Sequence, residues 1–581
     1  MKKILSLLLT ILMLASFGVC AMAEETGSED FLLAEKEMSF YMDDPEAVEQ
    51  QTVYFPDDSD VPYLSLRDWA DIMTRLFKIV SDDENYTYCL NFSMEDGVGI
   101  LTREDGYSVS FDAEHDVISF LDYDAFLRPS TDRLLIDILS VDEPAPNEEA
   151  KYFHRSEGSY ERYGKTVTLN LADYGIDLFS DGENCYVPVQ TLSDFMLAPY
   201  YRNIFYNGEA IFLSRFGGLG MAEHPSALGK LFYSVEARER SEAMAEFSYF
   251  ELCLAMDHLY GLKERHGISS FDEHAEQTAL KAELMSRDPF YADAALYELL
   301  NLHLDDLHSG FNSASPLDEE GAFDKLENML GYGYSSRQSD YQDMTYMKAR
   351  DNAYPDGVPA YEEIGNTAYI TFDTFIGIPG DVDYYETAPT ADEFDTIGIL
   401  LYAYEQITRE DSPIENVVLD LSCNGGGNAD TAIFTIATLL GEASVSVSDT
   451  MTGALCNAVY KVDCNLDGKF DEDDLGLTKK NIICLTSPNS FSCGNLVPCA
   501  LKSSNRATLM GRTSGGGSCV GRPLSTADGS AFQISGFLRL SYIKNGSFYD
   551  IDQGTEPDYP LMRPASFYDR EALTEYINAM K

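Results

Sequence analysis

The chain has 581 residues, of which 45% are hydrophobic and 12% aromatic, so a large packed core is expected rather than a disordered chain. Its formal net charge is −58, from 98 acidic and 40 basic residues. Such a negative surface repels phosphate backbones and anionic lipid heads, which argues against nucleic acid or a membrane surface as the partner. The 11 cysteines show neither the spacing of a small disulfide framework nor a paired CxxC metal motif.

Residues 1–23 have the pattern of a secretory signal peptide. Two lysines precede an apolar run from Ile4 to Val19, and Ala21-Met22-Ala23 provides a small-residue cleavage site. This run of about 16 apolar residues is shorter than the roughly 20 that a membrane-spanning helix needs. We therefore expect the mature protein to be secreted into the extracellular space, with no membrane partner after the signal is cleaved.

Three regions are predicted before the C-terminal third of the chain. Residues 30–215 are predicted to form a β-rich accessory region with two related modules, at 60–77 and 185–214, in which a strand and a "VP" turn lead into a short helix. Apolar residues at three- and four-residue spacing predict helices over 225–312. Residues 313–360 are rich in Ser, Asp, Gly and Tyr and are predicted to be a loop-rich connection.

From residue 361 to residue 581, strand-like and helix-like runs alternate. "NTAYITFDTF", "IENVVLDLS", "NIICLTSP" and "RATLMG" are typical of strands, and "EFDTIGILLYAYEQI", "NADTAIFTIATLLG" and "VPCALKSS" separate them as helices. This order predicts an α/β fold with a predominantly parallel sheet and crossover helices.

Two short turns in this region carry candidate chemistry. In "VVLDLSCNGGGNAD", residues 417–430, three glycines follow a strand and precede a helix, so backbone N–H groups can approach a ligand closely there. In "NSFSCGNLVP", residues 489–498, Ser492 stands between a strand and a helix. It is either a nucleophile presented at a helix N-terminus or an ordinary helix cap.

A candidate base precedes both turns. His308 lies in "LHLDDLHSGF", residues 302–311, where a predicted helix ends and a loop begins. A histidine on a helix is often structural, but an exit from a helix into a loop is also a common place to present a general base.

Taken in order, these stretches and "RATLMGRTSGGG" resemble the C-terminal processing (tail-specific) serine peptidases, most closely the tricorn-like branch and the chlamydial protease-like activity factor. The resemblance covers roughly residues 230–581. It implies a crotonase-like ααβ peptidase core and a serine endopeptidase that hydrolyses peptide bonds through an acyl-enzyme. Protein or peptide substrates would be its partners.

Carried over to this chain, the resemblance assigns the nucleophile to Ser492 and the base to His308. The oxyanion donors would be the amide of Cys493 and that of Gly426 or Gly427. Many members use a lysine base about 25 residues after the serine, but Gly517 stands at that position, which favours a Ser–His mechanism.

The third catalytic residue is less well defined by the resemblance. The position in register with the acidic residue of the tricorn-like branch is Ile551, which leaves Asp550, Asp552 or Glu556. We take Asp552, beside the Gly554 turn, as the candidate.

Two alternatives to this reading remain. Cys493, one residue after Ser492, is a possible nucleophile for a thiol peptidase. The missing lysine and the undefined acid also fit a catalytically degenerate extracellular binding protein on the peptidase scaffold.

A separate motif predicts structural calcium. "DCNLDGKFDEDD", residues 463–474, has the spacing of an EF-hand loop, with Gly468 where the chain must turn sharply. The alternative is a solvated acidic loop. The predicted ligands are Asp463, Asn465, Asp467, Lys469 through its carbonyl, Asp471 and Asp474.

Overall fold

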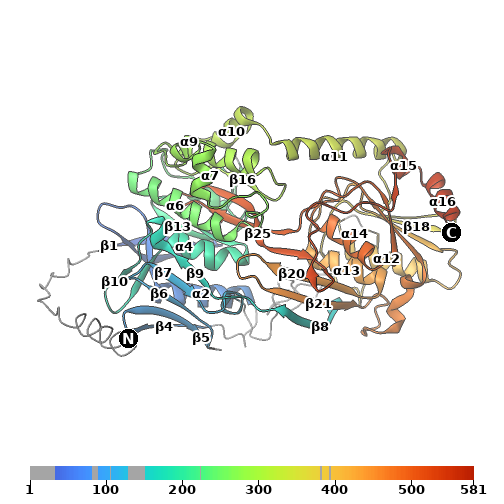
Figure 1. Ribbon diagram of the computed structural model, residues 1–581, viewed down its shortest axis with the longest axis horizontal. Coiled ribbons are helices and arrows are strands. Elements are labelled where there is room, and N and C mark those ends of the chain that lie inside the picture. The colour runs from blue at the N-terminus through green and yellow to red at the C-terminus, as the bar shows by residue number, and fades with distance from the viewer. Residues whose placement is uncertain are drawn as a thin grey trace, which may run out of the picture.

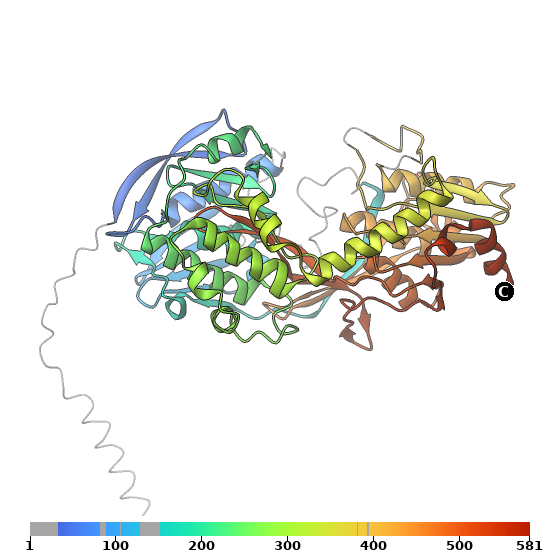
Figure 2. The ribbon, with the colours of Figure 1, turned by 90° about the horizontal axis from the view of Figure 1, so that it is seen from above.

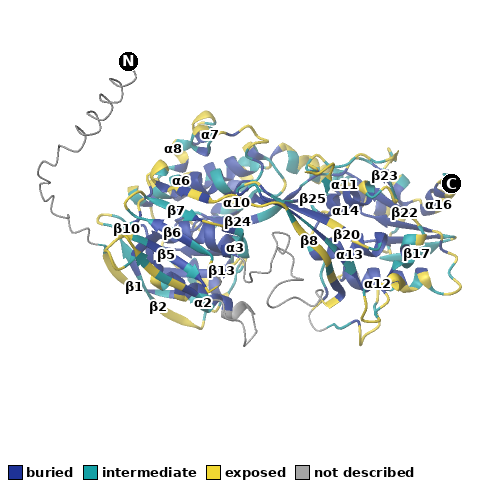
Figure 3. Ribbon diagram, turned by 60° about the horizontal axis from the view of Figure 1, so that its bottom comes forward, coloured by how far each residue is buried: buried dark blue, intermediate teal, exposed yellow. Residues whose placement is uncertain are grey.

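The computed structural model describes residues 33–81, 89–104, 106–127, 151–222, 224–379, 382–391 and 394–580. The predicted signal peptide at 1–23 lies outside these ranges. The described residues form two lobes (Figure 1): an N-terminal lobe from most of residues 33–330 and a C-terminal lobe from most of residues 361–580. Buried residues fill the interior of both (Figure 3). None of the described helices combines the length and apolar character needed to cross a bilayer.

The two predicted strand–helix modules of the N-terminal lobe share one sheet. β3 (Tyr63–Ser65) leads directly into α2 (Leu66–Ser81). β11 (Cys185–Pro188) leads into α4 (Val189–Leu192) and the π-helical turn η4 (Ser193–Leu197). β3 and β11 pair antiparallel, so the two modules lie side by side. In spatial order the seven strands are β10 (Phe179–Ser180), β11 (Cys185–Pro188), β3 (Tyr63–Ser65), β2 (Val48–Phe55), β1 (Ala34–Met42), β13 (Ala210–Arg215) and β12 (Arg202–Tyr206).

A second, antiparallel sheet of five strands completes the β-rich part of this lobe. Its β5 and β6 alternate between buried and partly exposed residues, as expected where one face of a sheet packs on the core. The strands are β4 (Leu90–Glu95), β5 (Val98–Arg103), β6 (Ser108–Asp112), β7 (Val117–Phe120) and β9 (Val167–Asn170), with α3 (Tyr123–Leu127) and η3 (Leu171–Tyr174) beside them.

The helices predicted over 225–312 are present. Ser241, Ser270 and Asp288 cap three of them by accepting backbone N–H groups in the first turn. The helices are α5 (Ala227–Phe232), α6 (Glu242–Leu259), α7 (Phe271–Gln277), α8 (Lys281–Leu284), α9 (Pro289–Glu298) and the π-helical turn η6 (Leu299–Leu304). His308 follows η6 and precedes β16 (Gly310–Ser313).

The C-terminal lobe has the predicted α/β fold. β18, β19, β22 and β23 pair in parallel, and α12 (Thr396–Thr408), α13 (Ala429–Leu440) and α14 (Cys493–Ser503) lie between them in the chain. The sheet order is β17 (Tyr361–Ile364), β18 (Thr367–Thr371), β19 (Asn416–Asp420), β22 (Asn481–Thr486), β23 (Ala507–Gly511) and β28 (Tyr559–Pro560). Since β19 and β22 are parallel neighbours, the turns that follow them meet at one edge of the sheet.

A fourth large sheet joins the two lobes (Figure 1). Its order is β16, β25 (Ala531–Ser541), β20 (Ala443–Asp449), β21 (Leu455–Val462) and β8 (Phe153–Arg162), with β24 (Cys519–Ser525) paired to β25. β8 lies within the range predicted as an accessory region, yet it pairs with β21, which lies in the range 361–581 predicted as the α/β core. The boundary predicted at residue 215 therefore does not separate two independent units, because the partner of β8 is about 300 residues away in sequence, beyond the reach of any local pattern.

The loop-rich connection predicted over 313–360 is wrong. Residues in this range form α10 (Ala322–Leu330) and α11 (Tyr334–Ala353), and α11 runs from one lobe to the other (Figure 2). In α11 only Tyr346 and Arg350 are buried, so the sequence has no apolar stripe that would predict a helix. Specific polar contacts hold it instead: the Arg350 guanidinium donates to both carboxylate oxygens of Asp373 at 2.6 and 2.7 Å.

The remaining elements are short. They are η5 (Ala198–Tyr200), β14 (Gly220–Met221), β15 (His224–Pro225), η7 (Glu472–Lys479), β26 (Ile543–Lys544), β27 (Ser547–Phe548), α15 (Ala565–Tyr568) and α16 (Arg570–Ala579). Nine of the described cysteines are free thiols: Cys89, Cys185, Cys253, Cys423, Cys464, Cys484, Cys493, Cys499 and Cys519.

Candidate active site

Ser492 stands at the tight turn between β22 and α14. Its backbone has φ 55° and ψ −120°, and its side chain makes no capping hydrogen bond to the helix. A non-glycine residue in this conformation costs about 1–3 kcal/mol and persists only where the surroundings enforce it. Here the Ser492 N–H donates to the Gly516 carbonyl at 2.9 Å, and the carbonyl of Ser492 accepts the N–H groups of Asn495 and Leu496, each at 2.9 Å. The residue occupies the cap position, but its hydroxyl does not act as a cap.

The glycine turn after β19 lies directly against Ser492. Gly426 has φ 113°, and a Cβ at this position would lie 2.7 Å from the Ser492 Cβ and 3.2 Å from its Oγ. Only glycine therefore fits between the turn and the serine. The buried Asn424 side chain orders the turn, since its Oδ1 accepts the Gly426 N–H at 2.9 Å and its Nδ2 donates to the Phe372 carbonyl at 3.0 Å.

The three predicted oxyanion donors differ in availability. The Gly426 amide is already bound to Asn424. Among the described residues, the amides of Gly427 and Cys493 meet no hydrogen-bond acceptor. Cys493 is the first residue of α14, where amides lack an acceptor within the helix. The arrangement leaves Gly427 and Cys493 as the pair that can receive a developing negative charge.

The backbone around His308 is held by one carboxylate. Asp306 Oδ1 accepts the N–H groups of His308 and Ser309 at 3.1 and 3.0 Å, and Oδ2 accepts the Tyr260 hydroxyl at 2.9 Å. The Gln533 side chain, from β25, donates to the His308 carbonyl at 2.8 Å. His308 is thus fixed at the junction between the helical part of the N-terminal lobe and the sheet that joins the lobes.

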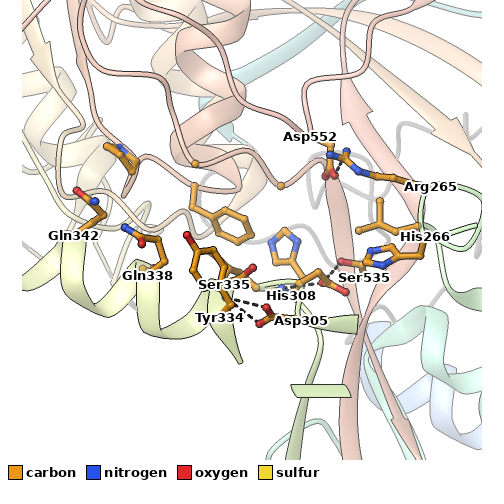
Figure 4. A pocket seen from close by; sticks show the side chains of 18 residues that line it. Arg265, His266, Asp305, His308, Tyr334, Ser335, Gln338, Gln342, Ser535 and Asp552 are labelled. Atoms are coloured by element: carbon orange, nitrogen blue, oxygen red, sulfur yellow. Dashed lines mark hydrogen bonds and ion pairs between the residues drawn. The ribbon is translucent and has the colours of Figure 1, made fainter. Parts of the chain in front are cut away.

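The His308 side chain is enclosed but has a free nitrogen (Figure 4). Its ring packs against Phe491 with centroids 4.6 Å apart, and its buried Nδ1 has no hydrogen-bond partner. Burial lowers the pKa of His308, although the nearby Asp306 and Asp552 carboxylates oppose this shift. The imidazole is therefore neutral at neutral pH, which is the form a general base requires.

Asp552 lies in the same pocket as His308 but binds other groups. Its Oδ1 accepts the N–H and the hydroxyl of Ser518 at 2.9 and 3.1 Å. Its Oδ2 forms an ion pair with Arg265, which comes from the N-terminal lobe (Figure 4). Within the described residues no hydrogen bond joins Ser492, His308 and Asp552, so the predicted triad is gathered in one region without being connected.

His308 and Asp552 border a cavity of about 390 Å³ between the lobes, and residues of α11 line it as well (Figure 4). Phe491 and Gly517 also line it. Ser492 is not among the lining residues, whereas Phe491, its neighbour in the chain, is. The Phe491 ring therefore stands at the cavity next to the predicted base, at the position in the chain directly before the predicted nucleophile.

Gly517 stands at the position where the resemblance would place a lysine base, and packing fills the space there. A Cβ on Gly517 would lie 2.5 Å from the Phe491 ring, and Gly517 has φ 82°. No side chain, lysine included, fits there without displacing Phe491.

Sequence reasoning missed several residues that shape this region. Asn495 ties α14 to two loops, since its Nδ2 donates to the Ile551 carbonyl at 2.9 Å and its Oδ1 accepts the Ser514 hydroxyl at 2.7 Å. Asn424 and Asp306 stand beside the glycine turn and His308 within the motifs themselves, so their polar side chains were a usable signal. Nothing near Arg265 in the sequence indicates its long-range ion pair.

The predicted calcium loop follows β21, and its side chains accept backbone amides. Asp463 accepts the N–H groups of Asp467 and Gly468 at 3.2 and 2.8 Å, and Gly468 has φ 78°. Asp474 accepts three, from Cys464, Asn465 and Asp471, at 2.8, 3.2 and 3.0 Å. Two further contacts close the loop: Asp467 pairs with the Lys469 ammonium, and Asp471 caps η7.

In the described part of the chain, no three or more His, Cys, Asp or Glu side chains are grouped so that they could hold a metal ion. The loop side chains accept backbone amides in this arrangement, and the calcium site stays a prediction.

Comparison with known proteins finds a likeness to one peptidase family. The family model described as peptidase family S41 matches residues 366–561, about a third of the chain, which include the parallel strands β18, β19, β22 and β23 and the Ser492 turn. This part of the chain is therefore similar to peptidase family S41. No curated protein matches the sequence.

Solved structures show more distant likenesses. The photosystem II D1 C-terminal processing protease is 20% identical with a TM-score of 0.27, over 36% of this chain and 46% of that one, so the match spans less than half of that protein. A putative peptidase from Parabacteroides merdae is 16% identical with a TM-score of 0.37, over 55% of this chain and 90% of that one. Mature CPAF bound to lactacystin is 14% identical with a TM-score of 0.27, over 37% and 50%.

Proposed function

We propose that the protein is a serine endopeptidase that cleaves protein or peptide substrates with Ser492 as its nucleophile. The observation that carries this proposal is the geometry of the Ser492 turn. The hydroxyl is free of capping bonds, the backbone is held at φ 55°, and Gly426 lies against the side chain. Strained turns of this kind, between a strand and a helix, present nucleophiles in hydrolases.

In the proposed reaction, neutral His308 accepts the proton of the Ser492 hydroxyl as its oxygen attacks the substrate carbonyl. The amides of Gly427 and Cys493 stabilise the oxyanion. The carbon–nitrogen bond then breaks, the amine leaves with the proton from His308, and water releases the acyl group in a second, equivalent cycle. Because no hydrogen bond joins Ser492 and His308 in this structure, the two must come within reach, about 2.6–3.2 Å, when substrate binds.

The thiol alternative is disfavoured by the environment of Cys493. Its side chain is only 5% exposed, and burial raises the pKa of the thiol to about 12. At neutral pH the thiol therefore carries its proton and is a poor nucleophile.

The proposal is tested by comparing Ser492→Ala with Ser503→Ala. Ser503 is an exposed serine near the end of the same helix, and its hydroxyl donates only to the Ala500 carbonyl. We expect the mature protein and Ser503→Ala to cleave unfolded casein and to be labelled by a fluorophosphonate, and Ser492→Ala to do neither. Cleavage by Ser492→Ala at the wild-type rate would rule out this nucleophile.

A second candidate function is a catalytically degenerate binding protein, and the unconnected Asp552 and His308 favour it. It predicts that the intact protein cleaves nothing across pH 5–9 and is not labelled by the fluorophosphonate, while still binding polypeptides. The same experiment therefore separates the two functions.

We also propose that the protein is exported and acts outside the cell, on the strength of the charged and apolar pattern of residues 1–23. We expect the mature N-terminus to be Glu24 when the protein is recovered from a culture medium and sequenced. Retention of Met1 in the recovered protein would contradict export by this signal.

A further inference from the structure

The helix α11 forms a wall of the cavity that contains His308. Tyr334, Ser335, Gln338, Ser339 and Gln342 all line this cavity, and all come from the first nine residues of α11 (Figure 4). The start of the helix is fixed at this place, since the Asp305 carboxylate accepts the Ser335 N–H at 2.9 Å. One end of α11 is therefore part of the candidate active site.

A row of large apolar side chains runs along α11 from the same end. Tyr334, Tyr341 and Met344 are 69%, 60% and 64% exposed, and we call these three residues the α11 row. Positions separated by seven and by three residues lie on one face of a helix, so Tyr341 and Met344 are neighbours there and Tyr334 lies two turns before Tyr341. Tyr334 belongs both to the row and to the lining of the cavity. Exposed large apolar side chains grouped on one face mark binding surfaces in soluble proteins.

The charge of α11 differs from that of the protein as a whole. The net charge of the chain is −58. In α11, however, the basic residues Arg337 and Lys348 offset two of the three acidic residues Asp340, Asp343 and Asp351, while Arg350 is buried and paired with Asp373. A polypeptide that approaches α11 meets no strong local repulsion from acidic side chains, so apolar contact decides whether it binds there.

The cavity alone is too small to hold a polypeptide. At about 390 Å³ it has the size of a site for one small ligand or for a few side chains. From Tyr334 to Met344 the row is about 15 Å long at ~1.5 Å per residue, which matches four or five residues of extended chain at ~3.3 Å each. Tyr and Met are also side chains that adapt to varied apolar partners.

We propose that the α11 row is the docking surface for an unfolded polypeptide with apolar side chains, which extends from the row into the cavity at His308. This inference depends on the proposed peptidase function for its biological purpose, because it names the class of substrate: unfolded chains rather than folded proteins or short polar peptides. Binding itself, however, requires only the row and the cavity, so it can be measured without catalysis.

The test measures binding of a fluorescein-labelled, reduced and alkylated polypeptide to full-length mature Ser492→Ala protein by fluorescence anisotropy. The test variant adds Tyr341→Ser and Met344→Ser. The matched control adds Tyr291→Ser and Met562→Ser, which remove a tyrosine and a methionine of similar exposure, 57% and 73%, outside α11. We expect the Kd to rise roughly five- to tenfold in the test variant and to change by less than about twofold in the control.

Two results would overturn the proposal, and a third would require a further variant. Equal Kd values for the two double variants would show that the row does not bind the chain. A wild-type dimer that becomes monomeric only in the test variant, as seen by light scattering, would assign the row to contact between two copies of the protein. Loss of helical circular dichroism in the test variant would call for the single variant Tyr341→Ser, which is expected to raise Kd about threefold by itself.

A kinetic arm separates this inference from the proposed function. With Ser492 intact, Tyr341→Ser/Met344→Ser is expected to lower kcat/KM for a long unfolded chain while leaving kcat/KM for a six-residue peptide unchanged. If the wild type cleaves neither substrate but the anisotropy difference persists, the peptidase proposal fails and the docking surface stands. If both substrates are cleaved equally by wild type and test variant, the docking surface fails and the peptidase proposal stands.

Discussion

The two sides of the candidate site are ordered to different degrees. On the nucleophile side, Ser492, Gly426 and Asn424 are locked by backbone hydrogen bonds and by a contact that admits only glycine. On the base side, His308 Nδ1 has no partner and Asp552 is paired with Arg265. The first side is built entirely on neighbouring parallel strands, whereas the second is assembled across the junction of two lobes. Side chains that are held by one sheet take their positions when that sheet folds. Side chains that meet at the junction of two lobes take positions that depend on how the lobes pack together.

The largest effect is expected on the nucleophile side, from Gly426→Ala. The added Cβ would lie 2.7 Å from the Ser492 Cβ at a positive φ, so the serine must move. We expect kcat to fall by about 10²–10³, comparable with loss of an oxyanion donor, because the nucleophile and its oxyanion donors no longer align. Gly425→Ala is the control, since nothing lies within 4 Å of its added Cβ. Equal activity of the two variants would show that this side is not rigid.

On the lobe that carries the base, a buried carboxyl pair predicts pH-dependent stability. Burial raises the pKa values of Asp194 and Glu251, that of Glu251 from 4.5 to about 8, and Glu251 Oε1 has no hydrogen-bond partner. The folded state therefore holds a proton that the unfolded state releases, so stability falls as pH rises from about 4.5 to 8 and then levels off.

Glu251→Gln should remove much of this dependence. We expect its melting temperature to exceed that of the wild type by several degrees at pH 8 and to approach it at pH 5. Glu246→Gln, a change at an exposed glutamate of α6, is the control. The same pH slope in wild type and Glu251→Gln would contradict the assignment.

A smaller effect is expected from Asp552→Asn, which tests how strongly the Asp552 carboxylate raises the pKa of His308. Since burial lowers the pKa of His308, we expect the acid limb of kcat/KM to lie below pH 6.5. Asp552 raises this pKa, so Asp552→Asn should move the limb to still lower pH. Titration of the His308 ring by NMR measures the same shift without requiring activity. An unchanged limb and ring titration would show that Asp552 acts only through Arg265 and Ser518.

Sequence reasoning succeeded where local pattern and final contact coincide. Apolar strands followed by glycine and serine turns predicted the parallel sheet, and parallel neighbours bring the turns after β19 and β22 to one edge. It failed where contacts are distant or polar: β8 joins β21 across about 300 residues, and α11 is a helix held by the Arg350–Asp373 ion pair rather than by a buried apolar stripe. The Arg265–Asp552 pair belongs to the same class, because two charged residues carry no sequence mark of being partners.

The smallest effect is expected from calcium, which would strengthen the nucleophile side because the 463–474 loop leads through η7 into β22 and on to Ser492. Three backbone amides occupy the Asp474 carboxylate in this structure, so any bound ion must displace them. That cost should hold the gain in unfolding free energy below the ~2.7 kcal/mol that mass action gives at a hundredfold excess over Kd.

We therefore expect millimolar calcium to raise the melting temperature by only a few degrees over chelator. The double variant Asp463→Ala/Asp467→Ala should lose this increase, whereas Asp411→Ala, at a residue whose side chain is 94% exposed, should keep it. Identical melting curves of the wild type with calcium and with chelator would mean that the EF-hand spacing is only a solvated acidic loop.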